Sequence, residues 1–237
     1  VTQLSNAPEQ TMTSQELAER IGVSAHTIKN EMPQVAQILN ENGARLVSRR
    51  HKGYYVEVLD PEAYDHPQEN VWIAKSATVA PTASITGPCI IGEKTEVRQC
   101  AFIRGNALVG DDGVVGNSTE LKNVILFDGV QVPHYNYVRD SILGWHSHMG
   151  AGSITSNVKS DKLLVKVHAE DGDIETGIKK FGAMLGDCVE VGCGSVLNPG
   201  TEIGRNCNIY PLSSVRGCVD ENSIYKKQGE IAKKVQE

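Results

Sequence analysis

Aliphatic residues recur with a six-residue period through the last two-thirds of the chain. The period first holds without exception, shifts phase at Leu126 and again at Leu143, and returns at Leu185. Such a period does not fit an α-helix, and an internal repeat outweighs weaker local signals. It predicts short strands joined by tight corners and stacked as coils around a continuous aliphatic column. The repeating positions are Ile73, Val79, Ile85, Ile91, Val97, Ile103, Val109, Val115, Leu121, then Leu126, Val132, Val138, Leu143, Met149, and finally Leu185, Val191, Leu197, Ile203, Ile209 and Val215.

Residues 1–60 have a different pattern, helical at first and extended later. Thr13 followed by Glu16 is a capping-box signal, and Leu17 and Ile21 then share one helical face. A second helical stretch comes after a tight turn. Two strands are then predicted around the basic sequence RRHKG. This part is therefore expected to form a small α/β domain of its own.

The remaining boundaries follow from breaks in these two patterns. Residues 61–70 contain two prolines and several acidic residues, which is typical of a linker. The repeat covers residues 71–225 and fails at about 158–181, where a hairpin loop is expected to leave the coil. The segment 226–237 is expected to form a short helix or tail.

Composition narrows the functional classes. The formal net charge is −6, which argues against a protein that coats nucleic acid broadly. Aromatic residues make up only 5% while glycines number 23, as expected for aliphatic strands joined by tight turns. No apolar run approaches a membrane span, no signal peptide is evident, and none of the six cysteines forms a CxxC pair. These features predict a cytoplasmic protein with reduced thiols.

The segment MTSQELAERIGVSAHTIKNEM, followed by the basic hairpin, resembles the winged helix-turn-helix of bacterial transcriptional regulators. The resemblance implies a helix in the major groove of DNA and a wing on the phosphate backbone. Lys29, Arg49, Arg50 and Lys52 are the nucleic-acid-binding residues that it implies. A small domain used only for packing or protein contact is the open alternative.

The repeat itself resembles the hexapeptide-repeat family, which implies a left-handed parallel β-helix. Residues 100–157 and the sequence KKFGAMLGDCVEVG resemble the acetyltransferase domain of the bifunctional enzyme that makes UDP-N-acetylglucosamine. LNPGTEIG and YPLSSVRG are more similar to archaeal versions. The resemblance implies a homotrimer that acetylates glucosamine-1-phosphate or galactosamine-1-phosphate from acetyl-CoA without a metal. The nucleotidyltransferase domain of that enzyme is not recognisable in this sequence.

Residue roles carry over from this resemblance position by position. His134 matches the catalytic base, and an imidazole is suited to accept a proton from an amine near neutral pH. Fixed cations are suited to a sugar phosphate. The residues implied for the acceptor are Arg104, Lys122, Tyr137, Asn157 and Lys180; those implied for CoA are Gly150, Ala151, Cys193 and Pro211.

Alternatives remain at the sequence level. His148, Val158, Cys193 and Pro211 depart from the family pattern, which bears most on the donor site. Arg104 and Lys122 are also explained as solvated surface charge, and His134 as a stacking residue at a corner. A zinc site would need three histidines among His134, His146, His148 and His168, but the family spacing for such ligands is absent. A non-catalytic regulator that senses a sugar nucleotide is the alternative from another functional class.

Overall fold

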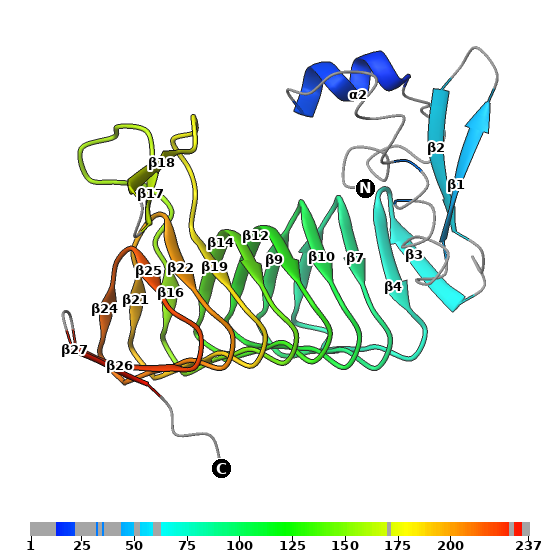
Figure 1. Cartoon of the computed structure of the whole chain (residues 1–237). Helices are drawn as coiled ribbons and strands as arrows, with labels where there is room; N and C mark the ends of the chain where they lie inside the picture. The colour runs from blue at the N-terminus through cyan, green and yellow to red at the C-terminus, as the bar shows by residue number, and fades with distance from the viewer. Residues whose placement is uncertain are drawn as a thin grey trace. The chain divides into compact units, whose positions relative to one another are not determined.

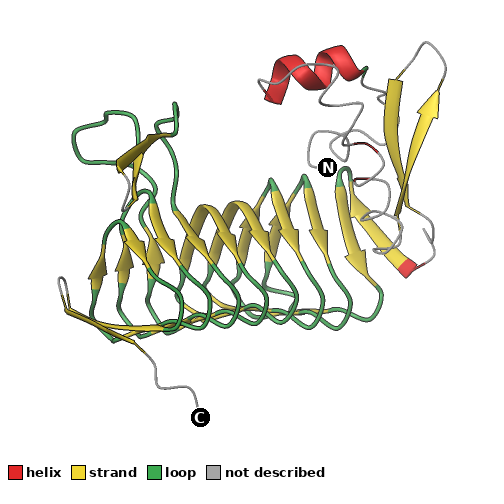
Figure 2. Cartoon of the chain, in the orientation of Figure 1, coloured by secondary structure: helices red, strands yellow, loops and turns green. Residues whose placement is uncertain are grey.

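A computed structural model describes residues 13–21, 32, 35, 44–49, 53–58, 63–169, 172–227 and 230–233. The chain divides into two compact units, residues 1–65 and residues 66–237. Strands make up nearly all the regular structure of the second unit (Figures 1 and 2). Within the described part of the chain, no helix is long and apolar enough to cross a membrane.

The first unit contains helix α2 (Ser14–Ile21) and an antiparallel hairpin of β1 (Ala44–Arg49) and β2 (Gly53–Val58). The expected capping box is present, because the Thr13 amide donates to a Glu16 carboxylate oxygen at 2.7 Å and the Glu16 amide donates to the Thr13 hydroxyl at 3.2 Å. Leu17 is buried. Most of the second helical stretch lies outside the described residues, as do Lys29, Arg50 and Lys52.

The second unit is a parallel β-helix with three faces, as the six-residue period predicts (Figure 1). The first face holds β4 (Val71–Ala74), β7 (Cys89–Ile91), β10 (Ala107–Val109), the ends of β12 (Glu120–Leu126) and β14 (Tyr137–Leu143), β19 (Ala183–Leu185), β22 (Thr201–Ile203) and β25 (Cys218–Val219). The second holds β5 (Thr78–Val79), β8 (Glu96–Val97), β11 (Val114–Asn117), β13 (Gln131–His134), β15 (His148–Met149), β20 (Glu190–Val191), β23 (Asn208–Ile209) and β26 (Ser223–Lys227). The third holds β6 (Ser84–Thr86), β9 (Phe102–Arg104), the starts of β12 and β14, β16 (Ile154–Thr155), β21 (Val196–Leu197) and β24 (Ser214–Val215).

The repeating aliphatic side chains form the core of this β-helix. Every repeat position from Ile91 to Val215 is buried, with at most 4% of the residue exposed. The first three repeat positions are only partly buried and pack against the same cluster. Each coil is held to the next by backbone hydrogen bonds, such as the 2.8 Å bond from the Gly92 amide to the Val109 carbonyl. The aliphatic column and the coil-to-coil bonds together hold the unit in register.

The phase shifts of the repeat reflect shorter coils. Val71 pairs with Cys89, 18 residues on, whereas Ala107 pairs with Val124, 17 residues on. In the shorter coils, β12 and β14 each run through the corner between the third and first faces. Asn123 and Asp140 stand at that corner with φ of 52° and 49°. Asn and Asp tolerate this left-handed conformation better than most residues, which lets one residue be omitted from the corner.

A longer insertion produces the expected hairpin loop. Ser141 and Ala183 are 42 residues apart in sequence yet are joined by a 3.0 Å hydrogen bond. The inserted residues include the antiparallel strands β17 (Lys166–Ala169) and β18 (Gly172–Glu175). Val167 is buried at the base of this hairpin, and a Cβ at Gly200 would lie 2.3 Å from the Lys166 carbonyl oxygen. The hairpin is therefore packed closely against the coil.

Two segments contain strands that were not expected, although the division between the two units falls inside the expected linker. The expected linker contains β3 (Tyr64–Gln68), which lies beside β4 at the edge of the sheet. The expected C-terminal helix is instead β27 (Glu230–Lys233), which pairs antiparallel with β26. In both cases the end of a stack of coils offers unpaired backbone N–H and C=O groups. Pairing with that edge overrides the local preference of the segment.

We expect Leu121→Ala to lower the free energy of unfolding by about 2–5 kcal/mol, because it leaves a cavity in the aliphatic column. Leu121 is 0% exposed, whereas Leu163 is 63% exposed and gives a matched control. Leu163→Ala should change stability by less than about 0.5 kcal/mol. Denaturant titration of both variants measures the difference, and equal effects would contradict the assignment of Leu121 to the core.

Candidate active site on the third face

The residues singled out from the sequence gather along the third face and its two edges. His134 ends β13 at the edge between the second and third faces, and Tyr137 begins β14 on the third face. Arg104 ends β9, and Lys122 lies in β12. Asn157 and Lys180, the other residues implied for the acceptor by resemblance, lie in the segments that follow β16 and β18.

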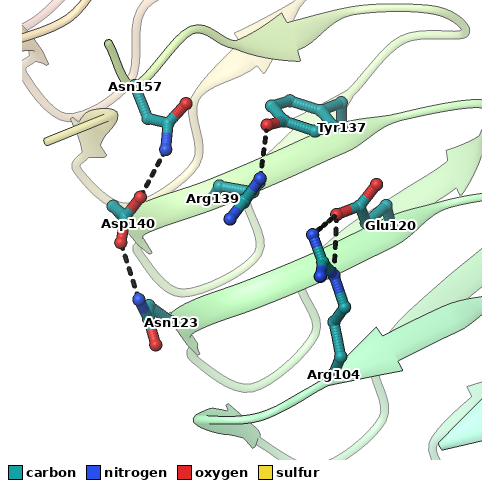
Figure 3. Close-up of polar contacts among 7 residues, drawn as sticks. All are labelled: Arg104, Glu120, Asn123, Tyr137, Arg139, Asp140 and Asn157. Carbon is teal, nitrogen blue, oxygen red and sulfur yellow. Dashed lines mark hydrogen bonds and ion pairs between the residues drawn. The ribbon is translucent and has the colours of Figure 1, made fainter. Parts of the chain in front are cut away.

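Arg104 is held by a carboxylate that sequence reasoning did not select. Its Nε and Nη2 both donate to Glu120 Oε1, at 3.1 Å and 3.0 Å (Figure 3). The guanidinium carbon also lies 5.4 Å from the centre of the Phe102 ring. Glu120 pairs with Phe102 on one side and with Tyr137 on the other. Arg104 is thus oriented on the third face, with its charge partly offset by Glu120.

Arg139 is a second residue that sequence reasoning missed. It pairs with Lys122 across adjacent coils, and its Nη1 donates to the Tyr137 hydroxyl at 2.9 Å (Figure 3). The guanidinium carbon lies 5.5 Å from the centre of the Tyr137 ring. The register of the repeat is the signal that could have identified Arg139, because it places this residue on the rung next to Lys122.

Asn157 belongs to a ladder of polar side chains at the corner between the third and first faces. Asn123 Nδ2 donates to Asp140 Oδ1 at 2.8 Å, and Asn157 Nδ2 donates to Asp140 Oδ2 (Figure 3). Asn106 extends the ladder through a 3.3 Å bond to Asn123. Only 6% of Asn157 is exposed. The Asn157 Nδ2 group is therefore occupied by Asp140, and this hydrogen bond also orients the Asn157 side-chain carbonyl oxygen.

His134 is exposed, and its imidazole makes no hydrogen bond or ion pair with any residue that the structure describes. Its backbone is held firmly instead. The His134 amide donates to Asn136 Oδ1 at 3.1 Å, and its carbonyl accepts from the Gly152 amide at 2.9 Å. Asn136 is buried and donates from Nδ2 to the Gly150 carbonyl at 2.8 Å. Asn136 thus fixes the corner from which the His134 ring projects.

The Gly150–Gly152 turn lies beside this corner, and two of its amides are already used. The Gly150 amide donates to the Val191 carbonyl at 2.7 Å, and the Gly152 amide donates to the His134 carbonyl. Ala151 is exposed, and its amide has no partner among the described residues. Gly152 has a φ of 67° and open space around it. Of the three amides, only that of Ala151 has no partner among the described residues and is left to bind a ligand.

The other residues implied for CoA continue the same edge on the following coils. The Ala151 carbonyl accepts from the Gly194 amide at 2.9 Å, and the Cys193 carbonyl accepts from the Leu212 amide at 2.9 Å. Cys193 and Pro211 are both exposed. The edge from His134 to Pro211 is therefore one continuous row of coil corners, which we call the donor edge.

The surroundings of His148 and Lys180 are defined by contacts of these residues or of their neighbours. His148 Nδ1 lies 2.8 Å from Glu190 Oε2 on the second face, so its ring interacts away from the third face. Lys180 is exposed and directly precedes Phe181, whose amide donates to the Asn157 carbonyl at 3.0 Å. The chain thus returns from the hairpin loop to the polar ladder immediately after Lys180. Val158 is partly buried.

The candidate metal ligands do not gather. The His146 ring packs edge-on against Trp145 at 4.0 Å, and His168 Nδ1 pairs with Asp173 at 2.7 Å on the hairpin. Among the residues that can be described, no three His, Cys, Asp or Glu side chains are arranged to hold a metal ion.

Burial raises the pKa of the Cys89 thiol to about 12, so this cysteine is a packing residue.

Comparison with known proteins divides the chain in a similar way. The model of the GMPPB C-terminal domain family matches residues 85–179, and the model of the HTH domain family matches residues 1–55. A hexapeptide transferase family protein from Anaplasma phagocytophilum superposes with a TM-score of 0.47 at 16% identity, covering 70% of this chain and 80% of that one.

Curated relatives are more informative. The bifunctional protein GlmU of Methanococcus maripaludis strain S2 is 34% identical over 220 residues, which cover 83% of this chain and 53% of the relative. A bifunctional sugar-1-phosphate nucleotidylyltransferase/acetyltransferase from Sulfurisphaera tokodaii is 30% identical over 201 residues, covering 74% and 50%. The chain spans about half the length of these relatives. It is thus a hexapeptide-repeat relative of the bifunctional GlmU and sugar-1-phosphate nucleotidylyltransferase/acetyltransferase proteins, with an HTH-type segment at its N-terminus.

Proposed function

We propose that the protein transfers an acetyl group from acetyl-CoA to the amine of an amino-sugar 1-phosphate. The main support is the position of His134 at the start of the donor edge, where the third face begins, with an exposed imidazole that has no hydrogen-bond or ion-pair partner among the described residues. The proposed acceptors are glucosamine-1-phosphate and galactosamine-1-phosphate, the two compounds that the sequence resemblance implies. The Sulfurisphaera tokodaii relative is a bifunctional sugar-1-phosphate nucleotidylyltransferase/acetyltransferase, which supports the same class of acceptor.

The proposed chemistry begins with proton transfer. The His134 imidazole accepts a proton from the acceptor amine while the nitrogen attacks the thioester carbonyl carbon. The new C–N bond gives a tetrahedral intermediate, whose oxyanion the Ala151 amide stabilises. The C–S bond then breaks, and the CoA thiolate takes up the proton from the imidazolium. Products are the N-acetylated sugar phosphate and CoA.

Acceptor binding is assigned to the third face and the segments beside it. Arg104, Lys122 and Lys180 bind the phosphate, because charge-assisted hydrogen bonds from Arg and Lys suit its oxygens. Tyr137 and Asn157 orient the sugar. Asp140 fixes the Asn157 amide group, so the Asn157 carbonyl oxygen is the group left to accept from a sugar hydroxyl. Gly150, Ala151, Cys193 and Pro211 bind CoA along the donor edge.

We predict that His134→Ala lowers kcat by roughly 10²–10⁴-fold, the usual scale for a positioned general base. The KM for the acceptor should change little, since the phosphate-binding cations are untouched. Arg104→Ala should instead raise that KM. Steady-state measurement of free CoA thiol, with glucosamine-1-phosphate and galactosamine-1-phosphate as acceptors, tests both variants.

His168→Ala is a matched control, because His168 pairs with Asp173 on the hairpin loop. It should keep the kcat of the wild type. All variants must first form the same oligomer as the wild type. Full kcat in an active preparation of His134→Ala would rule out His134 as the base.

We also propose that the protein forms a homotrimer through residues 66–237. Support comes from the resemblance to hexapeptide-repeat enzymes and from the compactness of this unit. Removal of residues 1–65 should leave the molar mass at three chains. Light scattering of the truncated and full chains measures this, and a monomeric truncated protein would contradict it.

For the N-terminal unit we propose weak DNA binding. The match of residues 1–55 to the HTH domain family and the β1–β2 hairpin support it. The basic sequence RRHKG joins the two strands, and phosphate contacts of this kind weaken as salt rises. A gel-shift titration at two salt concentrations should give weak, salt-sensitive binding. Tight and salt-insensitive binding would contradict this prediction, and absence of binding would favour a packing role.

A further inference from the structure

Basic side chains occupy neighbouring rungs of the third face. Arg139 pairs with Lys122, and the register that places Ile103 opposite Leu121 puts Arg104 on the rung beside Lys122. Adjacent strands are spaced about 4.8 Å apart. Like charges directly opposite each other in a sheet are destabilising. The fold thus holds three cations in a row at a cost to stability.

Among the described residues, the nearby carboxylates offset the charge of only one of these three cations, Arg104. Glu120 pairs with Arg104 at 3.0 Å. Asp140 follows Arg139 in sequence, but its two oxygens accept from Asn123 and Asn157 at the corner. Figure 3 shows this polar ladder lying apart from the Arg139 guanidinium. Within the part of the chain that is described, neither Lys122 nor Arg139 has an ion-pair partner.

The Arg139 side chain also has an unused donor. Its Nε is buried and makes no hydrogen bond to any described residue. Leaving a buried donor unpaired costs free energy, more so when the group is charged. Its Nη1 is fixed by the Tyr137 hydroxyl at 2.9 Å, and the backbone amide of Arg139 donates to Thr155 Oγ1 at 2.9 Å. The guanidinium is thus held in place, and its Nη2, which makes no hydrogen bond to any described residue, is left to bind a ligand.

We propose that Arg139 is a further acceptor-binding residue, which holds the phosphate together with Lys122 and is positioned by the Tyr137 hydroxyl. The inference rests on the proposed function for the identity of the acceptor. A phosphate supplies the negative charge that this row lacks and oxygens that accept from a guanidinium. Because Tyr137 contacts Arg139, this arrangement also couples the phosphate to the residue assigned to the sugar.

The test uses the full-length protein and inorganic phosphate as the probe. Arg139→Gln should raise the Kd for phosphate and the acceptor KM by roughly 10-fold to 100-fold, the scale of a lost charge-assisted hydrogen bond. The kcat at saturating acceptor should stay within about twofold, since an interaction equal in ground and transition states affects KM alone. Isothermal titration with phosphate and steady-state kinetics measure these quantities.

Arg98→Gln is the matched control. Arg98 pairs with Glu96 at 2.8 Å on the second face, away from the cationic row, and its loss should leave the phosphate Kd unchanged. If Arg139→Gln does not fold, Arg139→Met is tested in its place, because methionine is also a long unbranched side chain but carries no charge. Failure of both variants to fold would assign Arg139 a structural role and overturn the proposal.

The outcomes separate this inference from the proposed function. Unchanged phosphate Kd and acceptor KM in a folded Arg139 variant would overturn the inference even if acetyl transfer proceeds. Phosphate binding that depends on Arg139, in a protein that transfers no acetyl group, would support the anion site and reject the acetyltransferase. Absence of phosphate binding by the wild type would also overturn the inference.

Discussion

The coil-to-coil hydrogen bonds of the β-helix are the constraint on which the rest of the second unit depends. They join residues about one coil apart in sequence and stack equivalent side chains on neighbouring rungs. An aliphatic residue at each inward position completes the column, and burial of that column is the main favourable term. Because strand register has a period of two, a slip of one residue would turn the buried set outward. The same register therefore places Arg104, Lys122 and Arg139 on adjacent rungs of the third face.

The corners of the coil explain why the repeat changes where it becomes polar. At Asn123 and Asp140 a left-handed backbone shortens the coil by one residue, and the side chains join Asn106 and Asn157 in a hydrogen-bonded ladder. On the opposite edge of the third face, buried Asn136 ties the His134 corner to the Gly150 turn. Both edges bordering the site are thus stabilised by amide side chains rather than by apolar packing.

The third face between these edges is organised by charge. Glu120 orients Arg104, and the Tyr137 hydroxyl orients Arg139, so two guanidinium groups are held before any ligand binds. A rigid sheet can keep like charges on adjacent rungs because its stability comes from the buried column and not from its surface. Preorganised cations lower the cost of ordering side chains when an anion binds. This arrangement links the rigidity of the fold to the proposed binding of a phosphorylated acceptor.

The sequence alone determined the β-helix, the capping box at Thr13 and the hairpin loop. The β-helix depends on a six-residue repeat that recurs many times along the chain, and the other two features depend on local sequence. Through resemblance it also selected Arg104, Lys122 and Tyr137, which lie on the third face, and His134, which lies at the edge of that face. It missed the hydrogen-bonding roles of Glu120, Asn136 and Asp140, since each has a partner on a neighbouring coil. It also missed Arg139, which only the register of the stacked coils places beside Lys122. It assigned residues 226–237 to a short helix or tail, whereas Glu230–Lys233 pair as a strand with β26. Only the tertiary structure decided these points, because exposed sheet edges and cross-coil partners exist only once the coils have stacked.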